Sequence, residues 1–282
     1  MVDPQIVYVD DSGTDGRSRI AAAAFCVSTV EKWSAFERRW RNISVNAGFK
    51  HFHMTEFAAC KQEKPCRQCI DGKTALAEHP WRRWTTKKRR NVLDHLLGAV
   101  VDHVEYGVGI AHTKQDYEEH VKNSPARVVA GEPIGDEHFT YAVQRCGGEL
   151  SKWRAAQGID TPMKFVFDLT SKKEKDEIAK VFFGAASNRP QFDQNGLEQW
   201  FIPVGVFYES RKSVVQLLAA DILAWVTATI RARETFRQGE TLEMFQVAYK
   251  FADTEHIKMG GTPKSSLMDW EKGILDGAKT KR

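Results

Sequence analysis

The stretch Gln5-Ile-Val-Tyr-Val-Asp10-Asp11-Ser12-Gly13 decides the fold. Its apolar run over residues 5–9, followed abruptly by polar residues, predicts a buried strand that ends at Asp10. Residues 19–28 predict a second strand, and Gly13 and Gly16 supply the backbone freedom for a hairpin across residues 14–18. The chain is therefore expected to open with two antiparallel strands.

Helices and strands alternate after this hairpin. Apolar periodicity predicts helices at 31–46, 86–103, 136–157, 174–184 and 212–233. Further strands are expected at 104–112, 163–169 and 200–208, and Pro203 argues for an edge or an irregularity in the last of these. The alternation predicts an α/β fold in which helices flank a mixed β-sheet. We expect a single domain over 1–282, with an irregular cysteine-containing insertion at 51–84 and a C-terminal extension at 236–282.

The composition is that of a globular chain. Of 282 residues, 42% are hydrophobic and 28% are charged, with a net charge of +4, which excludes the composition of a disordered chain. No apolar run approaches the roughly 18 residues of a membrane span, so no membrane partner is expected. The N-terminus lacks the features of a signal peptide, which favours a cytoplasmic location.

Basic and aromatic residues gather in the segment Trp81–Arg90, and the chain ends with Lys279-Thr-Lys-Arg282. Such segments can hold phosphates and stack bases. They can equally face water as a solvated loop and helix start. The mild positive charge is compatible with nucleic acid and does not require it.

Isolated acids stand at unusual places. Asp10 ends the first strand, Asp168 ends a later apolar strand, and Asp221 lies inside the most apolar helix. Ionised acids are rarely buried without a partner or a metal. A shared Mg²⁺ or Mn²⁺ site would explain all three, and two such ions about 4 Å apart hydrolyse phosphodiesters. Strand alternation places Asp10 with Tyr8 and turns Asp11 to the opposite face.

Each acid also has a structural interpretation. Asp10 or Asp11 could cap the turn after the first strand. Asp168 could cap the loop that follows it. Asp221 could pair with Lys212 or with an arginine elsewhere.

Four segments in order resemble one family. Tyr8-Val-Asp-Asp-Ser-Gly13 is similar to the opening "Y-I-D-E-S-G" of the family catalogued as domain of unknown function 3800. Phe52-His-Met-Thr-Glu56 resembles its "F-H-a-x-E" element, and Phe165–Asp168 resembles its central strand. Ser213–Ala224 resembles its "S-x-x-x-Q-x-A-D-x-x-A" helix, with one extra residue between Gln216 and Ala220-Asp221. The likeness runs from about residue 5 to residue 230.

The resemblance implies an RNase H-like fold with a carboxylate active site formed by Asp10, Glu56, Asp168 and Asp221. Asp11 stands where the family often has Glu, and it becomes a candidate accessory metal ligand.

Other residues are candidates for contacts with substrate. His53 could orient a water or touch a phosphate near Glu56, although a histidine beside aromatic residues is more often structural. Lys172 and Arg211 follow predicted strand ends and could contact phosphates. Ser213 and Gln216 belong to the family-like helix and are further candidates for binding substrate.

The cysteines suggest a second metal. Cys60-x5-Cys66-x2-Cys69 is a partial Zn²⁺ motif. A fourth ligand could come from His51, His53 or His79, of which His79 completes the candidate set. The alternative is a group of cytosolic thiols without metal.

These observations favour a divalent-metal-dependent nuclease that acts on RNA or DNA. A non-catalytic module that binds nucleic acid or protein is the first alternative. An actin-like or sugar-kinase-like phosphotransferase is the second, because Asp11-Ser-Gly-Thr14 resembles the phosphate loop Asp-x-Gly-x-Thr of those proteins. The sequence does not choose between RNA and DNA, nor does it indicate an oligomeric state.

Overall fold

The computed structural model describes residues 5–13, 18–60, 80–123, 138–168, 203–210, 212–236 and 254–261, together with residues 175–176, 178, 246–247 and 250–251. The elements in chain order are β1 (Gln5–Ser12), β2 (Ile20–Thr29), α1 (Val30–Ala47), α2 (Met54–Ala59), η1 (Pro80–Arg83), α4 (Thr86–His103), β3 (Tyr106–Thr113), α5 (Lys114–Tyr117), η2 (Glu118–Lys122), α7 (His138–Gln157), β4 (Met163–Asp168), β5 (Pro203–Glu209), α10 (Leu217–Phe236) and β6 (Ile257–Gly261).

The strands form one six-stranded sheet in the order β5-β4-β1-β2-β3-β6. β2 runs antiparallel to both of its neighbours, β1 and β3. The other three pairs, β1 with β4, β4 with β5 and β3 with β6, are parallel. This mixed sheet confirms the predicted α/β class. β5 is an edge strand, and its register with β4 shifts between Met163 and Lys164, beside Pro203, so both features that this proline indicated are present.

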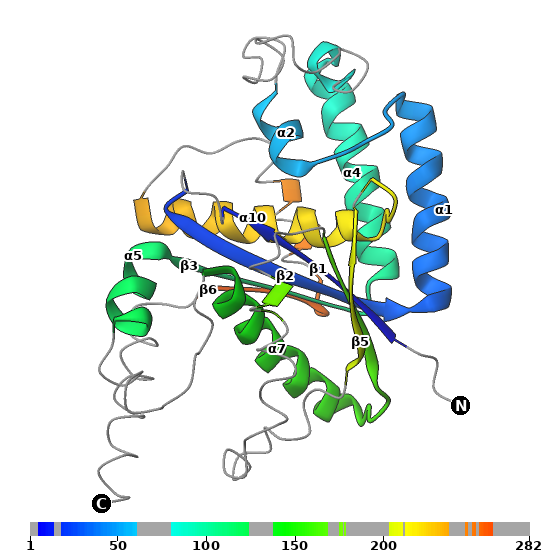
Figure 1. Cartoon of the computed structure of the whole chain (residues 1–282). Coiled ribbons are helices and arrows are strands. Elements are labelled where there is room, and N and C mark those ends of the chain that lie inside the picture. Colours follow the sequence, from blue (N-terminus) through cyan, green and yellow to red (C-terminus); the bar gives the residue numbers. More distant parts are fainter. Residues whose placement is uncertain are drawn as a thin grey trace, which may run out of the picture.

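Helices cover both faces of the sheet (Figure 1). α10 lies across one face, with α1, α2 and α4 on the same side, and α7 covers the opposite face. Each face has its own apolar cluster, one built around α10 and the other around α7. Among the described helices, none has the length and apolar character needed to cross a bilayer.

The first two long helices match their predicted bounds because local caps fix them. The Thr29 hydroxyl accepts the Lys32 N–H at the start of α1, and Gly48 ends that helix with a left-handed backbone at φ 82°. The Thr85 hydroxyl accepts the Lys88 N–H at the start of α4. Both ends of these helices are therefore determined by residues near in sequence.

Three predicted boundaries were wrong. β1 continues past Asp10 to Ser12, because β2 pairs with these polar residues and holds them in the sheet. α10 begins at Leu217 rather than at 212, since residues 212–216 form turns, in which the backbone N–H groups of Ser213 and Val214 donate to the Ser210 carbonyl. The segment after 236 is more than an extension, because β6 pairs with β3 and adds a strand to the sheet.

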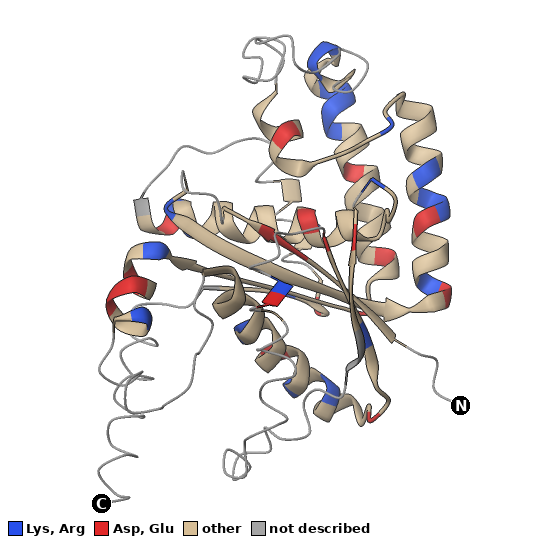
Figure 2. Ribbon diagram, viewed as in Figure 1, with Lys and Arg blue, Asp and Glu red and all other residues tan. Residues whose placement is uncertain are grey.

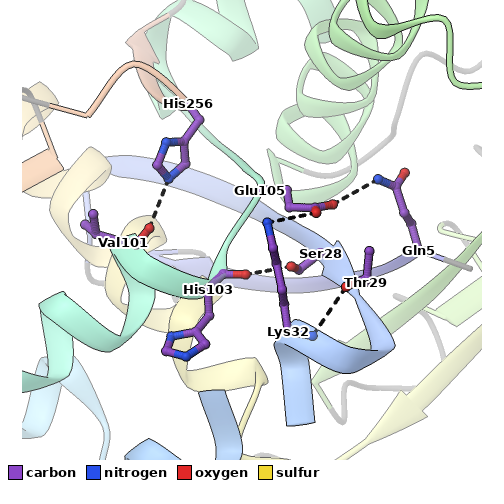
Figure 3. A network of polar contacts seen from close by, with 8 residues as sticks. All are labelled: Gln5, Ser28, Thr29, Lys32, Val101, His103, Glu105 and His256. Atoms are coloured by element: carbon purple, nitrogen blue, oxygen red, sulfur yellow. Dashed lines mark hydrogen bonds and ion pairs between the residues drawn. The ribbon is translucent and has the colours of Figure 1, made fainter. Parts of the chain in front are cut away.

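A polar network fastens the sheet at the beginning of β1 (Figure 3). The Gln5 amide donates to Glu105 at 3.1 Å, and Lys32 forms an ion pair with the same carboxylate at 3.0 Å. The Ser28 hydroxyl donates to the His103 carbonyl at 2.6 Å. These contacts tie the end of α4 to β1, β2 and α1, so the helices on this side have a fixed position relative to the sheet.

Small residues let α10 approach the sheet closely. A Cβ atom placed on Gly109 of β3 would lie 2.2 Å from the Thr227 hydroxyl oxygen of α10. A Cβ atom on Gly107 would lie 3.3 Å from Leu223. The absence of side chains at these two positions brings every side chain on the inner face of α10 close to the strands.

Candidate functional site

The ends of β1 and β4 bring two of the predicted acids together. These strands are parallel neighbours whose register pairs Val9 with Phe167. The next residues along the two strands are Asp10 and Asp168, so the two acids stand beside each other on strands that are about 4.8 Å apart. The two aspartates are far apart in sequence, and the parallel pairing of β1 with β4 makes them neighbours.

Both acids lie on the face of the sheet that α10 covers. Asp10 follows Tyr8 by two residues and Asp168 follows Val166 by two residues, and both of these apolar side chains pack in the cluster around α10. Asp10 is only 2% exposed. One of its carboxylate oxygens accepts the Asp11 N–H at 2.8 Å, a local contact of the kind expected for a turn cap.

The sequence reasoning missed two further acids near Tyr8, namely Glu37 and Glu209. β5 pairs Glu209 with Asp168, which puts Glu209 on the same face. Burial, and after it the negative charges of Glu37 and Glu209, together raise the pKa of Tyr8 to about 12. Figure 2 shows acidic positions on β1, β5, α10 and α2. A strand-end glutamate after an apolar run was the available signal for Glu209.

Asp221 connects α10 to α2. It is 1% exposed, and one carboxylate oxygen accepts the backbone N–H of Met54, the first residue of α2, at 2.7 Å. The other oxygen lies 3.4 Å from His53 Nε2. Asp221 therefore holds the start of α2 and does not form the ion pair with Lys212 that was one alternative.

His53 lies between two acids. Its Nε2 atom faces Asp221, and its Nδ1 atom is 3.8 Å from a Glu56 carboxylate oxygen. This arrangement brings His53 and Glu56 together with Asp221, although Glu56 and Asp221 are 165 residues apart in the chain. The candidate role of His53 next to Glu56 thus has a geometric basis.

A cavity of about 520 Å³ opens beside these groups. Its lining combines parts of α1, the loop before α2, α2 itself, the end of β4 and the turns before α10. The lining residues are Trp40, Arg41, Ser44, Lys50, His51, Phe52, His53, Glu56, Asp168, Ser210, Lys212, Ser213, Val215 and Leu218. The predicted site residues His53, Glu56, Asp168 and Ser213 therefore share one cavity.

Other candidates lie elsewhere. Asp11 lies on the same face of β1 as Val7 and Val9, which is the α7 face, and so points away from Asp10. The Gln216 amide donates to Glu37 at 3.1 Å, so this side chain joins the start of α10 to α1 and does not line the cavity. Lys172 and Arg211 lie outside the described residues.

The positions of the possible metal ligands can be compared within the described part of the chain. Within it, no group of three or more His, Cys, Asp or Glu side chains is arranged to hold a metal ion. Of the candidate zinc ligands, Cys60 is buried at the end of α2, where its N–H donates to the Glu56 carbonyl. Cys66, Cys69 and His79 lie outside the described residues.

In the segment Trp81–Arg90 the two tryptophans and Arg89 are buried, whereas Arg83, Lys87, Lys88 and Arg90 are exposed. Trp81 and Trp84 are buried and cannot stack on bases, which corrects that expectation. Arg89 is buried as well, and its guanidinium donates to the carbonyls of Phe57, Cys60 and Trp81. This arginine connects α4 to α2 and η1. The three carbonyls supply the hydrogen bonds that a buried guanidinium cannot obtain from water.

The sequence reasoning also missed the basic and hydroxyl groups of the cavity. Arg41, Lys50, Lys212, Ser44 and Ser210 all contribute to its lining. No sequence pattern marked them, since they come from a helix, a loop and a turn that only the fold brings together.

No family model matches this chain. A search of curated proteins likewise finds no significant match.

Proposed function

We propose that this chain is a divalent-metal-dependent nuclease of the RNase H-like fold, which hydrolyses nucleic-acid phosphodiesters. The observation that carries the proposal is the pairing of Asp10 and Asp168 at the ends of adjacent parallel strands, on the face covered by the helix that bears Asp221. Glu56 supplies an acid from the intervening segment. This order of acids agrees with what the family resemblance implies.

The donor set suits a hard cation. Mg²⁺ binds oxygen ligands and takes only one or two carboxylates per ion, completing its shell with waters and substrate phosphates. A set of three preassembled side chains, which the described residues lack, is therefore not required. Asp10 and Asp168 would hold one ion, and Glu56 or Asp221 would contribute to a second. Such ions activate a water and stabilise the leaving oxygen of a phosphodiester.

Neighbouring residues hold the acids in place. Asp221 accepts the Met54 N–H, and Arg89 binds the carbonyls at the other end of α2, so this short helix is fixed at both ends with Glu56 on the cavity. The Tyr8 hydroxyl is protonated at neutral pH, as that of any tyrosine with an ordinary pKa is, and burial with the nearby Glu37 and Glu209 charges raises that pKa to about 12. It is therefore a hydrogen-bond donor beside the acids.

The test compares two adjacent aspartates on opposite faces of β1. With Mg²⁺ or Mn²⁺ and a mixture of RNA and DNA, Asp10→Asn should lower the cleavage rate about a thousandfold, the equivalent of about 4 kcal/mol in the barrier. Asp11→Asn should stay within about threefold of the wild type, because a substitution away from the site has a small effect. Thermal unfolding of both variants shows whether they fold. Full activity in a folded Asp10→Asn protein would remove the proposal.

A second candidate function is a non-catalytic module that binds nucleic acid. The observation that favours it is that both carboxylate oxygens of Asp221 already face protein groups, the Met54 N–H at 2.7 Å and His53 Nε2 at 3.4 Å. Oligonucleotide binding that is the same with and without divalent ions, combined with no cleavage under any metal condition, would select this function over the nuclease.

A further inference from the structure

The cavity carries charges of both signs in separate places. Glu56 and Asp168 provide its acidic part, with Asp10 and Asp221 buried nearby on β1 and α10. Lys50 extends the lining from the loop between α1 and α2. Lys212 comes from the turn between β5 and α10, so the two lysines reach the cavity from different elements.

These two lysines differ from other cations around the cavity. Arg41, which also lines the cavity, is held by Glu37 at 2.6 Å. The ammonium groups of Lys50 and Lys212 have no ion-pair partner in the described part of the chain. Both lysines are exposed, so their charges are available to a ligand.

The charge pattern indicates the chemistry of that ligand. A phosphate is attracted by an ammonium group and repelled by a carboxylate unless a cation lies between them. A ligand with one phosphate could satisfy one lysine. A chain of phosphates can reach both lysines while another of its phosphates lies at the acids, and nucleic-acid backbones have this repeating charge.

The size of the cavity limits the form of that ligand. A volume of about 520 Å³ lies within the range of roughly 300–1,000 Å³ typical of small-molecule pockets. This volume equals that of a cube about 8 Å on edge, whereas a DNA duplex is wider than its major groove, which alone measures about 12 Å, so a duplex cannot be enclosed in this space. An unpaired strand can enter, because it presents one backbone and its bases can turn outward.

We propose that Lys50 and Lys212 bind backbone phosphates of a single-stranded segment of nucleic acid that enters this cavity. This inference rests on the proposed function, since it assumes that the acids of the cavity face a phosphodiester. It adds which groups hold the strand and which form of nucleic acid is accepted.

The experiment measures binding without cleavage. Fluorescence anisotropy follows a labelled single-stranded 20-nucleotide DNA and its RNA counterpart at several salt concentrations, with Ca²⁺ in place of Mg²⁺ so that a hard cation can lie between the acids and the phosphates. The double variant Lys50→Ala/Lys212→Ala should bind about tenfold more weakly at 0.1 M salt. The slope of log K against log salt should become less steep by about 1.4, which corresponds to two phosphate contacts on a single strand.

A matched control removes the same charge elsewhere. Lys152→Ala/Lys258→Ala deletes two lysines from α7 and β6, neither of which lines the cavity. It should bind within about twofold of the wild type, because it removes the same net charge away from the cavity, together with the exposed ion pair of Lys152 with Glu149. Thermal unfolding confirms that both double variants fold, which is expected since all four side chains are partly or fully exposed.

The outcomes separate this inference from the proposed function. Equal loss in both double variants, unchanged binding in the cavity variant, or no binding by the wild type would overturn the inference. Equally tight binding of a blunt duplex would overturn the preference for a single strand. Lysine-dependent binding with no cleavage under Mg²⁺ or Mn²⁺ would leave the inference standing and remove the nuclease. Cleavage that survives in the cavity variant, with binding unchanged, would overturn the inference and leave the nuclease standing.

Discussion

The two faces of the central sheet are built from different residues. On the α7 face, large apolar side chains such as Phe25, Phe165 and Phe167 pack against the helix. On the α10 face, the middle strands present small residues, among them Ala24 and Gly109, and the strand ends present acids. The same strands supply both sets by alternation.

This difference teaches how one sheet serves two purposes. Large side chains on the α7 face bury apolar area, which is the main source of stability. Small side chains on the α10 face allow close approach of the helix, and Asp221 thereby reaches the start of α2 near the strand-end acids. Stability and the candidate site are therefore assigned to opposite sides of the same backbone.

The largest expected effect comes from the α7 face. Phe165 is 1% exposed and packs edge-to-face on Phe25 with ring centroids 5.9 Å apart. Phe165→Ala should lower the free energy of unfolding by about 3–5 kcal/mol, because it leaves a cavity in a packed core. Urea denaturation measures this loss. Oligonucleotide binding by the folded protein should remain, and a large loss of binding at full folding would contradict the division between the faces.

Gly109 tests the α10 face. Gly109→Ala should lower the free energy of unfolding by about 2–3 kcal/mol, because the new methyl group would meet the Thr227 hydroxyl and push α10 away. Unlike Phe165→Ala, it should also weaken the function of the folded protein, since Asp221 moves with α10. Denaturation and activity are measured on the same samples. The double variant Gly109→Ala/Thr227→Ala should recover part of both, and no recovery would show that contact with Thr227 is not the cause.

The smallest effect, at neutral pH, concerns a buried histidine on the α7 face. Burial lowers the pKa of His112 from 6.5 to about 3, with the charge of His138 acting in the same direction. Neither ring nitrogen has a hydrogen-bond partner in the described part of the chain. Below pH 6.5 the unfolded chain binds a proton on His112, whereas the folded chain binds it only near pH 3. The stability of the fold therefore falls as the pH drops from 6.5 to about 3.

His112→Phe removes this proton. At pH 7 the variant should be about as stable as the wild type, because the ring stays in an aromatic cluster with Tyr117 and Tyr141. At pH 4.5 it should be more stable than the wild type. Urea denaturation at pH 7, 5.5 and 4.5 measures both. Parallel pH profiles of the two proteins would show that His112 does not contribute.

Local signals in the sequence predicted several elements well. α4 begins and ends where its periodicity and its Thr85 cap place it, and α1 ends at Gly48 as expected. β6 was not predicted, because five residues that include two glycines carry no strand signal until β3 pairs with them. The start of α10 was predicted too early, because residues 212–216 have helical composition and yet adopt turns.

The candidate site was predicted in part. Asp10, Asp168 and Asp221 stood out because each is an acid in an apolar setting, and the fold puts the three on one side of the sheet. Glu56 and His53 followed from the family resemblance and lie beside Asp221 through His53. Lys50 and Lys212 could not be found, since an exposed lysine looks the same in sequence whether or not a cavity lies beside it.

The sequence by itself determined which face each strand residue takes, because alternation is a property of the extended backbone and needs no partner. It determined in this way that Asp10 and Asp11 point apart. Only the tertiary structure decided which acids meet, because the pairing of β1 with β4 and the contact of Asp221 with α2 join segments more than 150 residues apart. Such contacts depend on how whole elements pack, and no local pattern encodes them.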